Sequence, residues 1–304
     1  MTPFLAVDWG TSKVRAWRID ADGLTSAQRE LPLGVSKIEP GQAQSVFARE
    51  IAAPLEAASL PALMCGMIGS NLGWTSVPYV DCPAGAAEIR DALVTVKHNP
   101  TVRIAPGLRC QGVAGTVDVM RGEETQLLGW MQSAPDGGTG RHIVCLPGTH
   151  AKWALIDNWR ITRFVTAMTG ELFEVLRTHS VLRSEDEPRQ DDAFLEGLTA
   201  AGDGGALSTR LFSARARVVA GGADNSTTSS YLSGLLIGAE AAAVPPLLSV
   251  TPREPIIVVG AAALAQRYKS ALEARGYVAS VYGGDEAVLS GLKMLVQQGV
   301  FDDA

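Results

Sequence analysis

The order of hydrophobic and polar positions predicts a run of strands and helices that occurs twice. In the first half, short apolar or alternating segments predict three consecutive strands, at residues 4–7, 14–19 and 24–33. The elements expected after them are a helix at 42–58, which Pro54 must kink or end early, a strand at 63–68, a helix at 84–93, a strand at 102–105 and a helix at 123–132.

The same order begins again after a glycine-rich break at residues 135–140. Its elements are expected as strands at 142–146, 152–156 and 160–165, a helix at 170–178, a strand at 255–260, a helix at 261–274, a strand at 277–282 and a helix at 286–298. The stretch from 183 to 250 is mostly helical, including a helix at 229–243. We interpret it as an insertion in the second copy.

A short internal repeat supports a duplication. Residues 7–13 (VDWGTSK) align with 145–151 (CLPGTHA), so that Gly10-Thr11 matches Gly148-Thr149 at an offset of 138 residues. Each Gly-Thr pair lies between the first and second strand of its copy. We therefore predict an α/β protein of two duplicated domains, at 1–138 and 139–304, the second with a helical insertion at about 183–250.

Composition excludes several classes of function. The chain has 304 residues, 46% of them hydrophobic, which is enough for one large or two ordinary cores. A net charge of -6 leaves no basic excess for nucleic acid or an anionic membrane surface. No basic leader or membrane-length apolar stretch is evident, so we expect a cytoplasmic protein. The 4 cysteines form no C-x-x-C pair and are expected as reduced, mostly buried thiols.

The two Gly-Thr turns are candidate phosphate sites. A glycine lets a phosphate approach the backbone, and a neighbouring hydroxyl adds a donor. Gly10, Thr11 and Ser12 would bind phosphate in one copy, and Gly148 and Thr149 in the other, gripping a polyphosphate across a cleft. Lys13 and His150 could neutralise phosphate charge, although His150 could equally cap its turn.

Asp8 distinguishes the first turn from the second, which has Leu146 at the matching position. A lone carboxylate suits a hydrated Mg²⁺ bridging nucleotide phosphates; the alternative is that Asp8 and Thr11 only organise a hairpin turn. Gly260 and Ala261 join a buried strand to a helix, where adenosine could lie against the backbone, or where the two elements simply pack closely. The chain lacks the P-loop and dinucleotide-binding glycine patterns.

These segments resemble the phosphate and adenosine segments of the actin, Hsp70 and sugar-kinase superfamily. Five longer ones resemble the signatures of the 2-dehydro-3-deoxygalactonokinase family: 65–70 (CGMIGS), 118–126 (DVMRGEETQ), 146–153 (LPGTHAKW), 168–173 (MTGELF) and 231–240 (YLSGLLIGAE). The resemblance spans nearly the whole chain. It implies two ribonuclease H-like, actin-like ATPase domains with a nucleotide cleft between them, and ATP-dependent phosphorylation of the 6-hydroxyl of 2-dehydro-3-deoxy-D-galactonate in galactonate breakdown.

One segment departs from the family pattern. Where the family commonly has Arg-x-Gly-Trp after Gly-Ser, this chain has Asn at 71 and Trp at 74. The resemblance places this segment at the sugar, so Ser70, Asn71 and Trp74 are candidate substrate contacts. The exact sugar acid stays open.

Three clustered carboxylates are candidates for the group that accepts the proton of the attacking hydroxyl. They are Asp118, Glu123 and Glu124. The two glutamates begin a predicted helix, where one of them could instead stabilise the helix dipole, and they are about 100° apart on it. The Gly-Glu-Glu-x-x-x-Leu arrangement resembles the segment that supplies the base in related kinases, which favours Glu123, with Glu124 and Asp118 as alternatives.

Arg121 is the candidate partner for the substrate carboxylate, although it could be an ordinary surface arginine. Two other functions stay open: a kinase for another sugar acid or hexose, and a non-catalytic ATP-dependent clamp or sensor. The lack of an appended peptide-binding or helix-turn-helix segment counts against the second. The apolar helix at 232–237 could serve a core or a homo-oligomer interface.

Overall fold

The computed structural model describes residues 1–134, 138–184, 191–202 and 206–301. Two compact units divide the chain. Unit 1 consists of Met1–Arg141, Ile156–Phe164 and Gly284–Ala304, and unit 2 of His142–Leu155 and Val165–Gly283. We describe each unit by itself.

Unit 1 is built on a six-stranded sheet with the order β3-β2-β1-β4-β7-β6. Its strands are β1 (Phe4–Trp9), β2 (Val14–Ile19), β3 (Thr25–Leu31), β4 (Ala62–Cys65), β6 (Val94–Val96) and β7 (Asn99–Ile104). The first three are antiparallel neighbours, whereas β4 is parallel to β1 and β7 is parallel to β4. A second sheet has the order β5-β8-β9, from Tyr79–Asp81, Gly107–Gln111 and Val117–Met120.

The helix predicted at 42–58 is shorter in the structure. It consists of α1 (Ala43–Val46) and a π-helical segment at Phe47–Ala52, and it ends before Pro54, which has no N–H to continue it. The prediction also missed β5, β6, β8 and β9. These strands are 3 to 5 residues long and are partly exposed, so they carry little hydrophobic pattern.

Helix α3 (Glu123–Ser133) packs closely on α10 (Gly284–Gln297). Unit 1 also contains the short helix α2 (Ala86–Asp91). A Cβ built on Gly129 of α3 would lie 1.8 Å from the Ala287 carbonyl oxygen. One built on Gly291 of α10 would lie 1.9 Å from the Thr125 carbonyl oxygen. Only glycine permits this approach, which holds the first turn of α3 in place.

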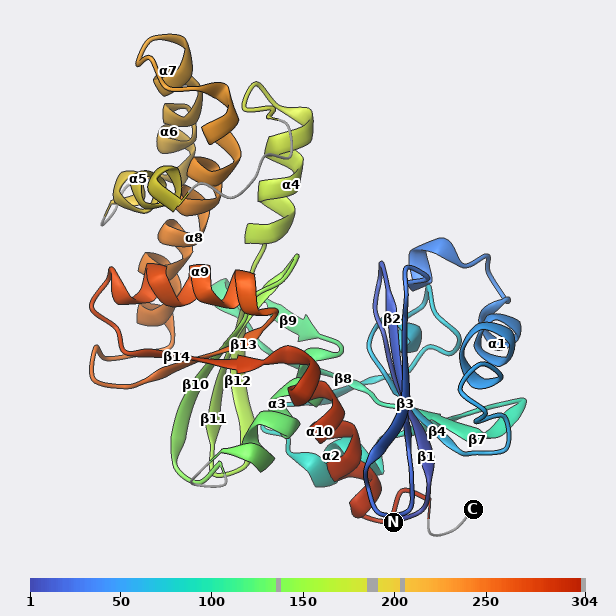
Figure 1. The fold of residues 1–304 in the computed structure, drawn as a ribbon. Coiled ribbons are helices and arrows are strands. Elements are labelled where there is room, and N and C mark those ends of the chain that lie inside the picture. The colour runs from blue at the N-terminus through green and yellow to red at the C-terminus, as the bar shows by residue number, and fades with distance from the viewer. Residues whose placement is uncertain (135–137, 185–190, 203–205, 302–304) are drawn as a thin grey trace. The chain divides into compact units, whose positions relative to one another are not determined.

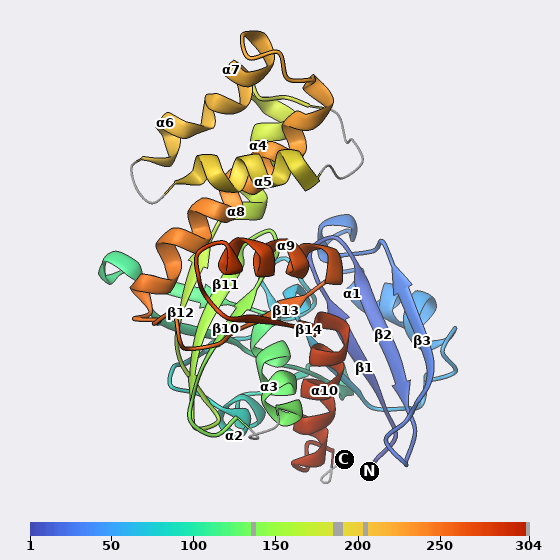
Figure 2. The ribbon, with the colours of Figure 1, turned by 60° about the vertical axis from the view of Figure 1, so that its left-hand side comes forward.

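Unit 2 repeats the strand order of unit 1. Its sheet has the order β12-β11-β10-β13-β14, with β10 (Arg141–Leu146), β11 (Ala151–Asp157), β12 (Arg160–Ala167), β13 (Ile256–Gly260) and β14 (Ala279–Gly283). The end of β11 and the start of β12, within Ile156–Phe164, are counted in unit 1. Strand β13 is parallel to both of its neighbours, as β4 is in unit 1. Helix α9 (Ala262–Glu273) lies over this sheet in Figures 1 and 2. The predicted duplicated α/β fold is confirmed.

Five further helices belong to unit 2: α4 (Thr169–His179), α5 (Asp191–Ala201), α6 (Leu207–Leu211), α7 (Ser213–Val219) and α8 (Thr228–Leu247). Helix α8 takes part in two cores. Tyr231 and Leu235 pack among the helices, whereas Ala241 and Val244 pack against the sheet and α9. Parts of the predicted helical insertion at 183–250, namely 185–190 and 203–205, lie outside the described residues.

The predicted domain boundary at 138 stays a prediction. In the structure α10 belongs to unit 1 because it packs on α3, and compactness by itself does not decide how the duplicated halves divide. All 4 cysteines are free thiols, with Cys65 and Cys145 buried. Within the described ranges, every helix is too short or too polar to span a bilayer.

Candidate active site

Hydrogen bonds from a neighbouring loop hold the first Gly-Thr turn in place. It follows β1, and its Thr11 and Ser12 side chains are exposed. The Thr11 carbonyl accepts hydrogen bonds from the Ser36 N–H at 3.1 Å and the Ser36 hydroxyl at 2.7 Å. A Cβ built on Gly34 would lie 2.1 Å from the Thr11 carbonyl oxygen, so the bracing segment needs a glycine there.

The second turn, in unit 2, is held by a hydrogen bond of the same kind. It follows β10, and the Thr149 carbonyl accepts a hydrogen bond of 2.9 Å from the Glu171 N–H in α4. A Cβ built on Gly170 would lie 2.3 Å from the Gly148 carbonyl oxygen. In both units the segment after the third strand holds the turn by its threonine carbonyl, so the repeat seen in the sequence extends to the hydrogen bonding.

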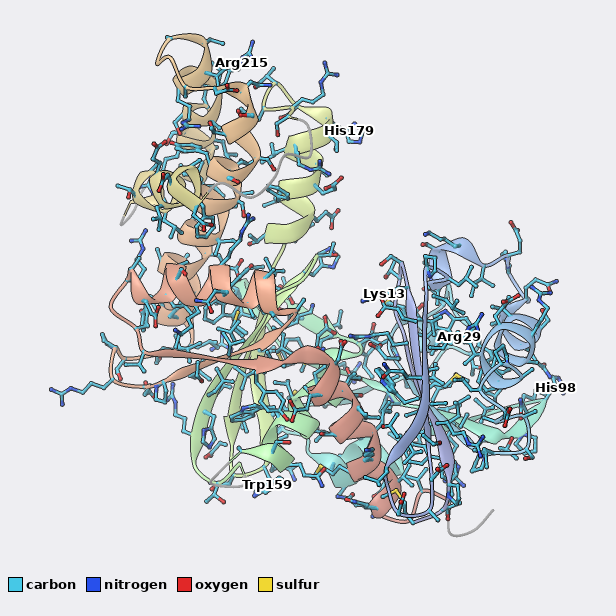
Figure 3. All side chains as sticks on the ribbon, viewed as in Figure 1. Lys13, Arg29, His98, Trp159, His179 and Arg215 are labelled. Carbon is cyan, nitrogen blue, oxygen red and sulfur yellow. The ribbon has the colours of Figure 1, made fainter. Side chains whose placement is uncertain are left out.

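The two basic residues beside the turns each contact a carboxylate of their own unit. Lys13, labelled at the start of β2 in Figure 3, donates to Glu30 at 3.1 Å, and both side chains are about half exposed. His150 contacts Glu171. Exposed pairs of this kind contribute little to stability and break easily. Binding of phosphate by Lys13 and His150 therefore stays a prediction.

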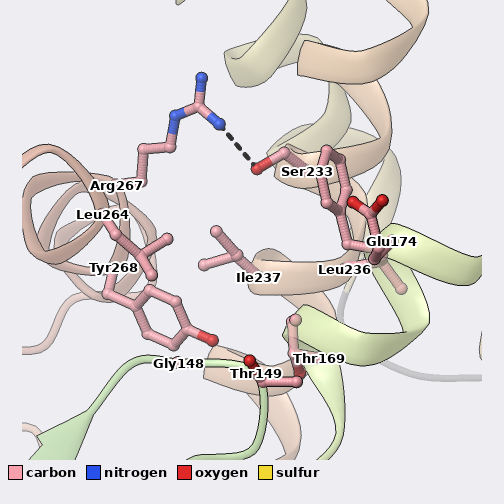
Figure 4. A pocket seen from close by; sticks show the side chains of 12 residues that line it. Gly148, Thr149, Thr169, Glu174, Ser233, Leu236, Ile237, Leu264, Arg267 and Tyr268 are labelled. Carbon is pink, nitrogen blue, oxygen red and sulfur yellow. Dashed lines mark hydrogen bonds between the residues drawn. The ribbon is translucent and has the colours of Figure 1, made fainter. Parts of the chain in front are cut away.

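The second turn forms the rim of a pocket of about 410 Å³ (Figure 4). Its other walls come from α4, α8 and α9, and the residues that line it include Thr169, Phe173, Ser233, Ile237, Leu264, Arg267 and Tyr268. Arg267 donates a hydrogen bond of 3.0 Å to the Ser233 hydroxyl. The mostly apolar wall with a few polar groups is typical of small-molecule sites.

Gly260 and Ala261 lie directly before α9. Gly260 is buried, and a Cβ built on it would lie 3.6 Å from Cδ of Pro147, which is an ordinary contact beside the second turn. The predicted adenosine segment therefore leads into the helix that supplies Leu264, Arg267 and Tyr268 to the pocket.

Asp8 lies between two neighbouring strands that supply its partners. In the register of the sheet, Arg15 of β2 and Cys65 of β4 stand opposite it. Arg15 donates to Oδ2 of Asp8 through two nitrogens, one of them at 3.1 Å, and also contacts Asp285 of α10. The Cys65 sulfur lies 3.9 Å from Oδ1 of Asp8.

The single carboxylate of Asp8 fits a metal ion that is held mainly by water. No group of three or more His, Cys, Asp or Glu side chains that could hold a metal occurs in the described part of the chain. Asp8 supplies one carboxylate, whose Oδ2 atom is already paired with Arg15. Mg²⁺ fits such a site because it keeps most of its waters and takes only one or two carboxylates.

The two glutamates at the start of α3 have different environments. Glu124 is buried, and its carboxyl accepts hydrogen bonds from the Gly122 N–H at 2.7 Å and the Thr125 hydroxyl at 3.1 Å. Burial, and then the charge of Glu123, raise the pKa of Glu124 to about 8. Glu123 is half-buried and accepts a hydrogen bond of 3.1 Å from the Arg121 N–H.

The ends of β1 and β4 meet the start of α3. A Cβ built on Gly122 would lie 3.3 Å from Cα of Gly66, the residue after Cys65. Burial, followed by the charges of Asp8 and Glu124, raises the pKa of the Cys65 thiol. These groups therefore share one electrostatic environment. Asp118 lies upstream on β9, where its carboxylate accepts a hydrogen bond of 2.8 Å from the Val119 N–H.

The Arg121 side chain packs under the neighbouring loop at residues 66–77. It donates to the Val77 carbonyl at 2.6 Å and lies over the Tyr79 ring at 4.4 Å. A Cβ built on Gly69 would lie 2.9 Å from its Nη1 atom. Nε and Nη1 are buried and have no hydrogen-bond partner among the described residues. Arg121 thus lies under the loop that contains the predicted sugar contacts.

Of those contacts, Asn71 has an exposed side chain. The Ser70 hydroxyl is used within the loop, donating to the Met67 carbonyl at 2.7 Å. The Trp74 ring packs on Phe47, with ring centroids 5.6 Å apart. Binding of substrate by these residues stays a prediction.

Three residues near these sites were not predicted from the sequence: Arg15, Glu240 and Tyr268. Arg15 could have been found from the tight turn between β1 and β2, which places it opposite Asp8. Glu240 is the only charged residue of the apolar helix α8, and it accepts a hydrogen bond from Tyr268 of the pocket wall. A single charged residue in a buried helix needs a hydrogen-bond partner, so Glu240 could have been singled out from the sequence, and a partner such as Tyr268 expected.

Comparisons with known proteins identify one family. The family model described as 2-keto-3-deoxy-galactonokinase matches residues 8–295. The 2-dehydro-3-deoxygalactonokinase of Escherichia coli K12 is 35% identical over 294 residues, covering 96% of this chain and 97% of that protein.

Two solved structures extend the comparison. A Sinorhizobium meliloti protein assigned as a 2-dehydro-3-deoxygalactonokinase has a TM-score of 0.86 at 35% identity, covering 97% of this chain and 98% of that one. The activator of 2-hydroxyisocaproyl-CoA dehydratase from Clostridium difficile, solved with ADPNP, has a TM-score of 0.51 at 10% identity over 98% of this chain and 97% of that one. The second likeness concerns the actin-like fold alone. The family match and the identity over nearly the full length establish that this chain belongs to the 2-keto-3-deoxy-galactonokinase family.

Proposed function

We propose that this chain transfers the γ-phosphoryl group of ATP to the 6-hydroxyl of 2-dehydro-3-deoxy-D-galactonate, in the breakdown of galactonate in the cytoplasm. Membership of the family makes it a kinase. The observation that carries the assignment of the site is that the Gly148-Thr149 turn, whose threonine is exposed, forms the rim of a pocket of about 410 Å³.

In this proposal the nucleoside occupies the pocket of unit 2. Leu264 and Ile237 provide apolar surface for the base, and Gly148 and Thr149 bind the phosphates. A Cβ built on Gly148 meets no heavy atom within 4 Å, so the space beside its backbone is open to a ligand. Backbone at a glycine is a common phosphate site because no side chain blocks it.

Unit 1 supplies the acidic groups of the reaction. Asp8 would hold Mg²⁺, which neutralises phosphate charge when it is bound. Glu123 would accept the proton of the 6-hydroxyl as its oxygen bonds to the γ-phosphorus and the bond to the β-phosphate oxygen breaks. Glu124 does not suit this role because it is buried and its carboxyl, with a pKa raised to about 8, is mostly protonated at pH 7.

The sugar acid would bind near Asn71, with Arg121 holding the loop and meeting the carboxylate. A kinase for a different sugar acid is the second candidate, because the exposed Asn71 stands where the family commonly has arginine. ADP release measured over a panel of aldonic acids and 2-keto-3-deoxy acids distinguishes the two. We expect the highest kcat/KM for 2-dehydro-3-deoxy-D-galactonate, with the 6-phosphate as product; a higher value for another acid would overturn the substrate assignment.

The nucleotide site is tested with a pair of alanine variants. Gly148→Ala adds a methyl group to open space, so it should leave the melting temperature unchanged and raise KM for ATP about tenfold or more. Gly170→Ala is the contrast, since its Cβ would lie 2.3 Å from the Gly148 carbonyl oxygen and should lower stability. A Gly148→Ala protein that binds ADP as the wild type does, measured by calorimetry, would contradict this placement of the phosphates.

A further inference from the structure

A buried carboxylate behind the pocket of unit 2 joins three elements. Glu240 of α8 is 5% exposed. It accepts hydrogen bonds from the Trp153 indole N–H of β11 at 2.6 Å and from the Tyr268 hydroxyl of α9 at 2.7 Å. The Thr169 side chain, at the start of α4, is hydrogen-bonded to it as well. A buried acid is costly unless donors of this kind satisfy it.

Two of these three donors belong to the wall of the pocket. Tyr268 and Thr169 line it, whereas Trp153 does not. Figure 4 shows the Tyr268 hydroxyl directed from α9 toward Thr169 and Thr149. Tyr268 is 1% exposed and Trp153 0%, so neither side chain can turn to water for another partner. The orientation of the Tyr268 ring therefore depends on Glu240 and on Thr169, whose side chain is hydrogen-bonded to Tyr268 as well as to Glu240.

Thr169 connects the same carboxylate to the phosphate turn. It is followed by Gly170, whose Cα packs against the Gly148 carbonyl, and by Glu171, whose N–H binds the Thr149 carbonyl at 2.9 Å. Ser233 and Ile237, two turns and one turn before Glu240 on α8, line the pocket too. One side chain thus holds the start of α4, the Tyr268 ring and the lining face of α8 at fixed positions.

We propose that Glu240 is a positioning residue for the nucleotide: it touches no substrate and preorganises the wall and the phosphate turn through Tyr268 and Thr169. This inference rests on the proposed function, which places the nucleotide in this pocket. It predicts that the loss of the carboxylate weakens binding of ATP and leaves binding of the sugar acid nearly unchanged. Preorganised contacts of this kind have large effects because small displacements of binding groups reduce rates strongly.

The matched variants remove one donor each. Tyr268→Phe deletes a hydroxyl that Glu240 holds in the wall, and Trp153→Phe deletes a donor outside it. We expect Tyr268→Phe to raise KM for ATP about fivefold to tenfold, with KM for the sugar acid changed less than twofold. Trp153→Phe should lower the melting temperature while KM for ATP stays within twofold of the wild type.

Two substitutions at position 240 complete the series. Glu240→Leu removes the acceptor and should raise KM for ATP at least tenfold. Glu240→Gln keeps the shape, offers its carbonyl to Trp153 and its amide to the hydroxyls, and should restore KM for ATP to within about threefold of the wild type. If Glu240→Leu does not fold, Tyr268→Phe and Glu240→Gln still test the inference.

The outcomes separate this inference from the proposed function. Leu264→Trp fills the pocket and should abolish ADP binding in calorimetry; unchanged binding would mean that the nucleotide lies elsewhere, and the proposed function would fail at this point. If Leu264→Trp abolishes binding but Tyr268→Phe leaves KM for ATP unchanged, or shifts both KM values equally, the positioning role of Glu240 is wrong.

Discussion

The buried Glu124 should make the stability of this protein depend on pH. Its pKa is raised from 4.5 to about 8, first by burial and then by the charge of Glu123. Between these values the carboxyl is protonated in the folded chain and ionised in the unfolded one. The unfolded state then binds fewer protons, so the free energy of unfolding falls as pH rises from 4.5 to 8.

The size of the effect follows from the same two values. One pKa unit corresponds to about 1.4 kcal/mol, so the complete effect, reached above pH 8, is about 5 kcal/mol. Between pH 5 and pH 7 the wild type should lose about 2.5 kcal/mol from this group alone. Glu124→Gln removes the ionisation and can keep both hydrogen bonds, its carbonyl accepting from the Gly122 N–H and its amide donating to the Thr125 hydroxyl.

Urea denaturation followed by circular dichroism at pH 5, 6, 7 and 8 measures this difference. We expect Glu124→Gln to be about as stable as the wild type near pH 4.5 and increasingly more stable at higher pH. Glu174→Gln, on the exposed part of α4, is the control and should show a difference that does not change with pH. If the advantage of Glu124→Gln is the same at pH 5 and pH 8, Glu124 ionises normally and our reason for excluding it as the base is lost.

Three other predictions each concern the substitution of one residue. Gly291→Ala forces a methyl group against the Thr125 carbonyl and should lower the free energy of unfolding by about 1–3 kcal/mol, visible as a lower melting temperature; an unchanged value would mean that α3 and α10 do not pack at this glycine. Glu123→Gln should abolish turnover while ADP still binds in calorimetry, and near-normal turnover would remove Glu123 as the base. Asp8→Asn should raise the Mg²⁺ concentration that half-maximal activity requires, and an unchanged requirement would refute the metal assignment.

Much of the fold was predictable because its signals are local. Strands β1, β2, β10 and β13 are mainly apolar, and they appear close to where the pattern places them. The second sheet of unit 1 was not predictable in this way, since strands such as β5 and β9 are short and mostly exposed. Nor does the pattern predict that α10 packs on α3, because that contact depends on glycine backbones far apart in the chain.

By itself the sequence determined the repeated strand order and the two turns. The hydrophobic pattern and the Gly-Thr pairs are local signals, each of which spans only a few residues. The resemblance to a kinase family likewise rests on short motifs in a fixed order. Only the tertiary structure decided the environment of each charge: Arg15 neutralises Asp8, Glu124 is buried where Glu123 is not, and Glu240 holds the wall of a pocket. The physical reason is that desolvation and hydrogen bonding depend on which distant segments meet, and these interactions set the protonation and orientation on which the chemistry depends.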